Sequence, residues 1–138
     1  MRKVDTPMTL RENYERIRAE VPEHVTIVVA AKTRTADEVR QLIDAGVKDI
    51  GKNYVQEAED LRMHLGSDAA RLRWHLIGHL QTNKANKVLA LFDIIQTLDS
   101  VKLAHAISNR ADKTVPVLIE INSGREPQKT GVLPDNAE

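Results

Sequence analysis

The sequence of 138 residues contains no cysteine. Disulfide bonds, thiolate catalysis and cysteine zinc sites are therefore excluded, and this absence fits a reducing cytoplasm. The longest apolar run, residues 25–31, is far shorter than the roughly 20 residues that a membrane-spanning helix needs. The amino-terminal residues are too charged for a signal peptide. We therefore expect a soluble, cytoplasmic protein.

Neither sign of charge is in excess, because 20 lysines and arginines balance 20 aspartates and glutamates. We therefore expect no nucleic-acid partner and no membrane partner. The sequence also lacks G-x-G-x-x-G, a Walker loop and G-x-S-x-G, which argues against binding of dinucleotides or nucleoside triphosphates and against a serine hydrolase. His75 and His79 are four residues apart on a strand and loop rather than on one helix, so we expect no metal site.

Apolar strand-like segments alternate with helical segments along the whole chain. The predicted strands are residues 25–33, 47–51, 73–77, 94–97 and 115–122. Their spacing of little more than twenty residues is typical of parallel β/α units with short loops. The length suits a single domain. The pattern predicts an α/β sheet or barrel with about five parallel strands, preceded by an amphipathic helix at about residues 7–21.

Polar residues at the helix boundaries predict where each helix begins. Thr35 and Glu38 have the spacing of a capping box, and Gly46 is expected to end that helix. A further helix is predicted over residues 82–91. The other predicted starts are Thr6 with Pro7, Asn53 with Gln56, Asp99, and a helix near Pro134.

Lys32 closes the first apolar segment, whose composition is typical of a buried strand. Side chains alternate along a strand, so Lys32 would share a face with Val28 and Ala30. Ligands of α/β proteins bind at the carboxyl ends of the strands, which is where Lys32 stands. The residues alone leave two interpretations: an exposed charge at the strand end, or a partly buried amine that forms a Schiff base with an aldehyde.

Four segments carry a family resemblance: AAKTRTADEVRQLIDAGVKDIGKNYVQEAEDL, RWHLIGHLQTNKANKV, QTLDS and VLIEINSGREPQKTGV. They closely resemble the pyridoxal phosphate homeostasis proteins, single-domain relatives of the alanine racemase barrel, from about Val25 to Val132. The resemblance implies a TIM-barrel-type (β/α) fold of the alanine racemase N-terminal kind, with an extra helix before the first strand. Residues 1–138 would form one partial barrel domain.

The same resemblance implies pyridoxal 5′-phosphate as the cofactor. The lysine of the A-x-K-T segment, here Lys32, would hold it as a Schiff base. Asn53 of the N-Y-V-Q-E motif and His75 of the W-H-x-I-G motif would lie around the cofactor. The implied role is a non-catalytic part in vitamin B6 homeostasis, with no catalytic residues. The alternatives are a pyridoxal-phosphate-dependent racemase-like enzyme, or a half-barrel interaction module completed by another chain.

Two features depart from the family pattern. Lys52 stands where the family usually has glutamate, and it would affect Lys32 only if both side chains point to the same place. The chain is also shorter than the roughly 200–250 residues of a full barrel, and the late segments that bind the cofactor phosphate in the family are not in this sequence. We therefore expect weak cofactor binding, and either self-association or pairing with a complementary carboxyl-terminal half-barrel.

Overall fold

The computed structural model describes residues 6–138, so residues 1–5 of the predicted domain lie outside the described residues. Five parallel strands form one sheet in the order β1-β2-β3-β4-β5. The strands are β1 (Val28–Ala30), β2 (Asp49–Lys52), β3 (Arg73–Leu76), β4 (Ile94–Leu98) and β5 (Val117–Ile119). Their spatial order follows the chain order, as in successive β/α units of a barrel. The predicted α/β fold with about five parallel strands is confirmed.

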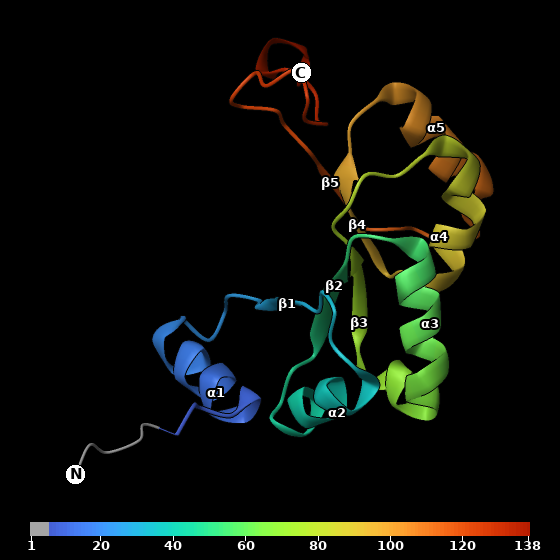
Figure 1. The fold of residues 1–138 in the computed structure, drawn as a ribbon. Helices are drawn as coiled ribbons and strands as arrows, with labels where there is room; N and C mark the ends of the chain where they lie inside the picture. Colours follow the sequence, from blue (N-terminus) through green and yellow to red (C-terminus); the bar gives the residue numbers. More distant parts are fainter. Residues whose placement is uncertain (1–5) are drawn as a thin grey trace.

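Among residues 6–138, all α-helices but the first lie between successive strands in sequence and along one face of the sheet in space, and the first precedes the sheet. The helices are α1 (Leu10–Glu20), α2 (Ala36–Asp44), α3 (Val55–Leu65), α4 (Ala85–Leu91) and α5 (Val101–Arg110), with short 3₁₀ segments η1 (Gly66–Arg71), η2 (Thr82–Lys84) and η3 (Pro134–Asn136). Figure 1 shows α3, α4 and α5 side by side along the strands. We call this side the helix-covered face and the opposite side the open face.

The core lies between the sheet and the helix-covered face. Trp74 is completely buried there; its indole N–H donates to the Ala69 carbonyl over 3.0 Å, and the Arg62 guanidinium of α3 lies 4.9 Å from the ring centroid. Because side chains alternate along a strand, His75 beside Trp74 belongs to the open face. A Cβ on Gly51 would meet side-chain atoms of Ile77 and Val28, so these three residues share the open face as well.

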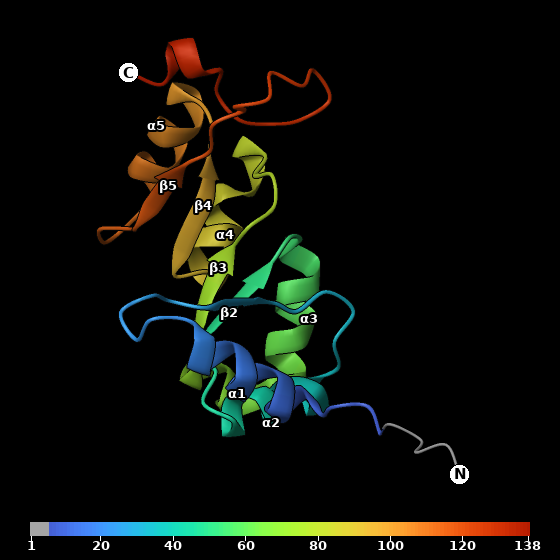
Figure 2. The ribbon, with the colours of Figure 1, turned by 90° about the vertical axis from the view of Figure 1, so that its left-hand side faces the viewer.

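Helix α1 packs beside α2 (Figure 2), and Figure 1 shows it on the opposite side of β2 and β3 from α3. It lies within the range predicted from its apolar spacing, but the predicted start at Thr6 and Pro7 is wrong. The N-cap is Thr9, whose hydroxyl accepts from the Glu12 backbone N–H while the Glu12 carboxylate accepts from the Thr9 N–H. This reciprocal capping box fixes the start at Leu10.

Two of the other predicted helix caps are wrong, and one is confirmed. Thr35 and Glu38 form the predicted capping box of α2. Asn53 does not cap α3, because the N-cap position is Tyr54 and its side chain makes no capping bond. Asp99 does not cap α5; the Ser100 hydroxyl accepts from the Leu103 N–H instead, while the Asp99 carboxylate lies 3.5 Å from Nδ1 of His79.

The strand and helix bounds also differ from several predicted ranges. The first strand is only three residues long and lies at an edge of the sheet, so its side chains are half-buried or exposed rather than buried. The last strand is equally short, because Pro116 precedes it and the chain after Ile119 bends into a loop held by Asn122. Residues 82–91 form a 3₁₀ turn followed by α4, and the segment near Pro134 forms a single 3₁₀ turn.

No helix among residues 6–138 combines the length and the apolar character needed to cross a membrane.

Gly78 must be a glycine, because a Cβ there would overlap the backbone carbonyl of Asn53. We predict that Gly78→Ala lowers the free energy of unfolding by about 1–3 kcal/mol, the usual cost of forcing atoms into a filled site. The control is Gly124→Ala, where the nearest atom is the Glu126 side chain at 3.6 Å. Urea unfolding of the three proteins measures the difference. Equal stability of the two variants would contradict this account.

Candidate functional site at the carboxyl ends of the strands

Strands β1, β2 and β3 bring Lys32, Asn53 and Gly78 together at their carboxyl ends. We call this end of the sheet the ligand edge, as distinct from the edge strands β1 and β5. Register sets Ala30 opposite Gly51 and Lys52 opposite Leu76, so the residues that follow these pairs leave the sheet together. Gly78 lies against the Asn53 backbone. His75 stands opposite Gly51, deeper in the sheet on the open face. The predicted residues Lys32 and Asn53 therefore lie at the edge, with His75 below them.

Lys32 lies in the turn after β1, not in the strand itself, and its side chain is exposed. Within residues 6–138 the Lys32 ammonium makes no hydrogen bond and no ion pair. The next residue, Thr33, has φ of 59°, a left-handed conformation that is unusual for a β-branched residue. The expected partial burial of the Lys32 amine is wrong, because its side chain is exposed. The Schiff base that was predicted for this amine is a separate property and stays a prediction.

A hollow of about 660 Å³ opens beside Asn53, at the carboxyl ends of β2 and β3. Asn53 is half-buried there, and Gly78 forms part of the same wall. The other lining residues are Tyr54, Val55, Gln56, Glu57, His79, Leu80, Gln81 and Lys84. The hollow offers amide, imidazole and ammonium donors at the edge where ligands of α/β proteins bind.

His75 is buried on the open face and both of its ring nitrogens are engaged. Nδ1 lies 3.0 Å from the Gln96 side-chain amide nitrogen, which can only donate. Nε2 therefore carries the hydrogen and donates to the Asp49 carboxylate over 2.8 Å. This chain of contacts fixes one tautomer and one orientation of the imidazole.

Asp49 is the charged centre of this network. The Arg73 guanidinium donates to the same carboxylate oxygen over 2.6 Å. Burial of the carboxylate raises its pKa, but the hydrogen bonds from Arg73 and His75 and the guanidinium charge outweigh this effect and hold the pKa of Asp49 below its ordinary value of 3.8. The carboxylate therefore stays ionised and anchors the imidazole of His75.

Lys52 belongs to the helix-covered face and does not share a site with the Lys32 amine. Its side chain is only 5 % exposed, and its ammonium donates to the Ala31 carbonyl over 2.7 Å. Burial lowers the pKa of Lys52 below its ordinary value of 10.5, and the Glu57 carboxylate opposes that effect. Around the ammonium lies a hollow lined by Thr33, Arg34, Ala36, Glu57, Asp60, Leu61 and His64.

Asp49 and Gln96 were not among the predicted site residues. The alternation along β2 does give Asp49 the same face as Gly51, and this signal was available in the sequence. The register that sets His75 within reach of both side chains is a property of the folded sheet. Among residues 6–138 no group of three or more histidines and carboxylates is arranged to hold a metal ion.

The fold and the edge together define the class of protein: a β/α barrel-type domain with polar groups gathered at the carboxyl ends of its strands. The alanine racemase N-terminal domain pattern matches residues 7–138, and the chain belongs to this family. Within it, the chain shows the resemblance to pyridoxal phosphate homeostasis proteins that its motifs predicted.

Curated relatives and solved structures support this assignment. The pyridoxal phosphate homeostasis protein of Escherichia coli K12 is 36 % identical over 115 residues, which cover 80 % of this chain and 49 % of the relative. The mouse protein of that name is 35 % identical over 117 residues, covering 78 % and 43 %. The chain thus spans about half the length of the curated relatives it matches.

Two solved structures of PipY from Synechococcus elongatus PCC7942 share the fold. The structure without pyridoxal phosphate has a TM-score of 0.85 and 30 % identity, covering 91 % of this chain and 60 % of PipY. The structure with pyridoxal phosphate bound has a TM-score of 0.78 and 33 % identity, covering 91 % and 58 %.

Replacement of the Asp49 carboxylate tests the buried network. We predict that Asp49→Asn lowers the free energy of unfolding at pH 7 by about 1–3 kcal/mol, because charge-assisted hydrogen bonds to Arg73 and His75 are lost. The folded-state pKa of Asp49 lies below the unfolded value of 3.8, so its contribution is present above that pH and is lost as pH falls through the folded pKa. Urea unfolding over a pH series measures this.

The matched control is Asp44→Asn, which removes the same charge from an exposed side chain 3.7 Å from Arg71. It is expected to change stability by less than about 1 kcal/mol. A difference between wild type and Asp49→Asn that stays constant from pH 7 down to pH 2 would refute the role given to the Asp49 charge.

Proposed function

We propose that this chain binds pyridoxal 5′-phosphate at the carboxyl ends of β1, β2 and β3, with Lys32 holding it as a Schiff base. The observation that carries the proposal is the exposed amine of Lys32, which has no hydrogen-bond or ion-pair partner within residues 6–138 and stands at the ligand edge. Asn53 lies at the same edge and His75 on the open face below it. PipY, a relative of the same fold, has been solved with pyridoxal phosphate bound.

The residues present fit the cofactor's aldehyde. The neutral Lys32 amine would attack the aldehyde carbon, a C=N bond would replace the C=O bond, and the carbonyl oxygen would leave as water with the two amine hydrogens, with no change of oxidation state. The exposed position of Lys32 allows both the entry of the aldehyde and the departure of water.

The role we propose is non-catalytic, in vitamin B6 homeostasis. The curated relatives carry the name of homeostasis proteins. His75, the buried imidazole of the open face, has both nitrogens engaged by Asp49 and Gln96, which favours a fixed wall of the site over a group that moves protons.

A racemase-like enzyme would need a second acid/base on the opposite side of the cofactor. Assays of alanine and serine racemisation, with Lys32→Ala as control, distinguish this alternative.

Trapping the Schiff base tests the binding proposal. We predict that incubation with pyridoxal 5′-phosphate followed by borohydride reduction gives a pyridoxyl adduct on Lys32, seen by peptide mass spectrometry. Lys48 is the internal control, because it is also exposed but precedes β2 at the opposite end of the strands. Lys32→Ala should lose the main adduct. An absence of adduct on Lys32 under conditions that label an intact relative, or equal labelling of Lys32 and Lys48, would contradict binding at this site.

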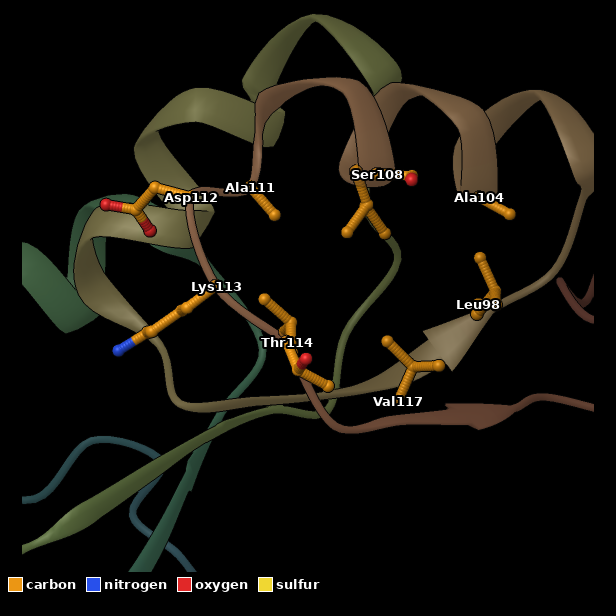
Figure 3. A pocket seen from close by; sticks show the side chains of 10 residues that line it. Leu98, Ala104, Ser108, Ala111, Asp112, Lys113, Thr114 and Val117 are labelled. Atoms are coloured by element: carbon orange, nitrogen blue, oxygen red, sulfur yellow. The ribbon is translucent and has the colours of Figure 1, made fainter.

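A half-barrel interaction module completed by another chain is the second candidate, and β5 is the observation that favours it. β5 is an edge strand, and its residues Val117, Leu118 and Ile119 are all exposed. Beside it, between α5 and the ends of β4 and β5, lies a hollow of about 460 Å³ (Figure 3). Unpaired, apolar strand edges recruit further strands. We propose that a further parallel strand and its helix, supplied by another chain, cover this edge and hollow.

Light scattering with matched variants tests that second proposal. We predict a concentration-dependent mass above that of the monomer, and a return to monomer in Ile119→Lys, because a charge on the edge strand opposes pairing. Ile119 is 57 % exposed; Val101 on α5 is 73 % exposed and away from the edge, so Val101→Lys should leave the mass unchanged. A compact wild-type monomer at all concentrations would rule out association between copies of this chain through β5.

A further inference from the structure

The Lys52 ammonium occupies a position where a backbone donor would be expected. The Ala31 N–H donates to the Gly51 carbonyl over 3.2 Å, so Ala31 is still paired with β2. In a parallel pair the N–H and C=O of one residue point to the same neighbour. The Ala31 carbonyl therefore also points towards β2, and the group that donates to it is the side-chain ammonium of Lys52, over 2.7 Å.

This contact is buried. Ala31 is completely inaccessible to solvent and Lys52 is 5 % exposed. A buried carbonyl needs a donor, because water cannot replace the lost hydrogen bond. Lys52 thus satisfies the Ala31 carbonyl, the first after the end of β1, at the point where the backbone of β2 turns away towards α3.

The segment that follows Ala31 is held at both ends. The Lys52 hydrogen bond to the Ala31 carbonyl fixes the start of this segment. The capping box of Thr35 and Glu38, which begins α2, fixes its end. Between them lie Lys32 and Thr33, with Thr33 at a φ of 59°. A left-handed β-branched residue persists only where its surroundings hold it. The path of this turn, and with it the Cα position of Lys32, depends on these two anchors.

We propose that Lys52 is a positioning residue for Lys32: its ammonium fixes the Ala31 carbonyl and so holds the turn that presents the Lys32 amine at the ligand edge. The inference rests on the proposed function only in assigning a task to Lys32. The holding of the turn itself is a property of the chain without cofactor and can be measured separately.

Lys52→Met separates positioning from general stability. Methionine keeps an unbranched, buried side chain but removes the donor and the buried charge. Loss of the buried charge raises stability, whereas a buried Ala31 carbonyl without a donor lowers it, so we expect only a small change in the urea midpoint. The Ala31 amide should exchange with solvent roughly tenfold faster, because the end of the β1/β2 ladder loses a hydrogen bond. The Ile77 amide, which donates to the Lys52 backbone carbonyl over 3.0 Å, is the internal reference and should be unchanged.

The second readout is the yield of pyridoxyl adduct on Lys32 after reduction. It should fall several-fold in Lys52→Met while labelling of Lys48 stays constant, and Lys48→Met is the matched variant that should alter neither readout. Unchanged Ala31 exchange in Lys52→Met would overturn the positioning role. If wild type itself forms no adduct on Lys32, the proposed function fails, whereas the exchange comparison still decides whether Lys52 holds the turn.

Discussion

The parallel pairing of β2 with β3 is the interaction on which the rest of the structure depends. Its register sets Gly51 opposite His75, and Lys52 opposite Leu76. One residue beyond this pair the Ile77 N–H still donates to the Lys52 carbonyl. The segments that follow β2 and β3 then separate, with Gly78 lying against the Asn53 backbone. A side chain on Gly78 would push these two strand ends apart. The hollow beside Asn53 and the buried imidazole thus follow from one register.

Alternation along the strands divides the polar groups between two tasks. On the open face, the Asp49 carboxylate holds His75 in one orientation and is itself held by Arg73. On the helix-covered face, Lys52 is buried beneath α2 and α3, and its ammonium closes the end of β1 at Ala31. The amine of Lys32 belongs to neither group. It stands in the turn between them and is exposed, so that under the proposed function an incoming aldehyde reaches it directly.

Periodicity and spacing predicted the number of strands, their parallel direction and the α2 capping box, because these are local properties. Spacing did not predict which of two neighbouring residues caps a helix. Asp99 and Ser100 are both good capping residues, and only the folded geometry shows that Ser100 caps α5. The apolar composition of β1 was typical of a buried strand, yet its edge position exposes it, and the order of strands in a sheet is not a local property. The contacts of Lys52 with Ala31 and of His75 with Asp49 depend on register in the same way. Lys32 was predicted from its place at the end of an apolar segment, and Asn53 from a family motif.

We propose that the cofactor site lies at the carboxyl ends of β1, β2 and β3. Backbone amide chemical shifts of the isotope-labelled chain, followed during titration with pyridoxal 5′-phosphate, test this placement. We expect the largest changes at Lys32, Asn53 and Gly78, with small changes at Leu98 and Val117 beside the hollow under α5. Changes concentrated at Leu98 and Val117, or no changes at a cofactor concentration that saturates an intact relative, would contradict it.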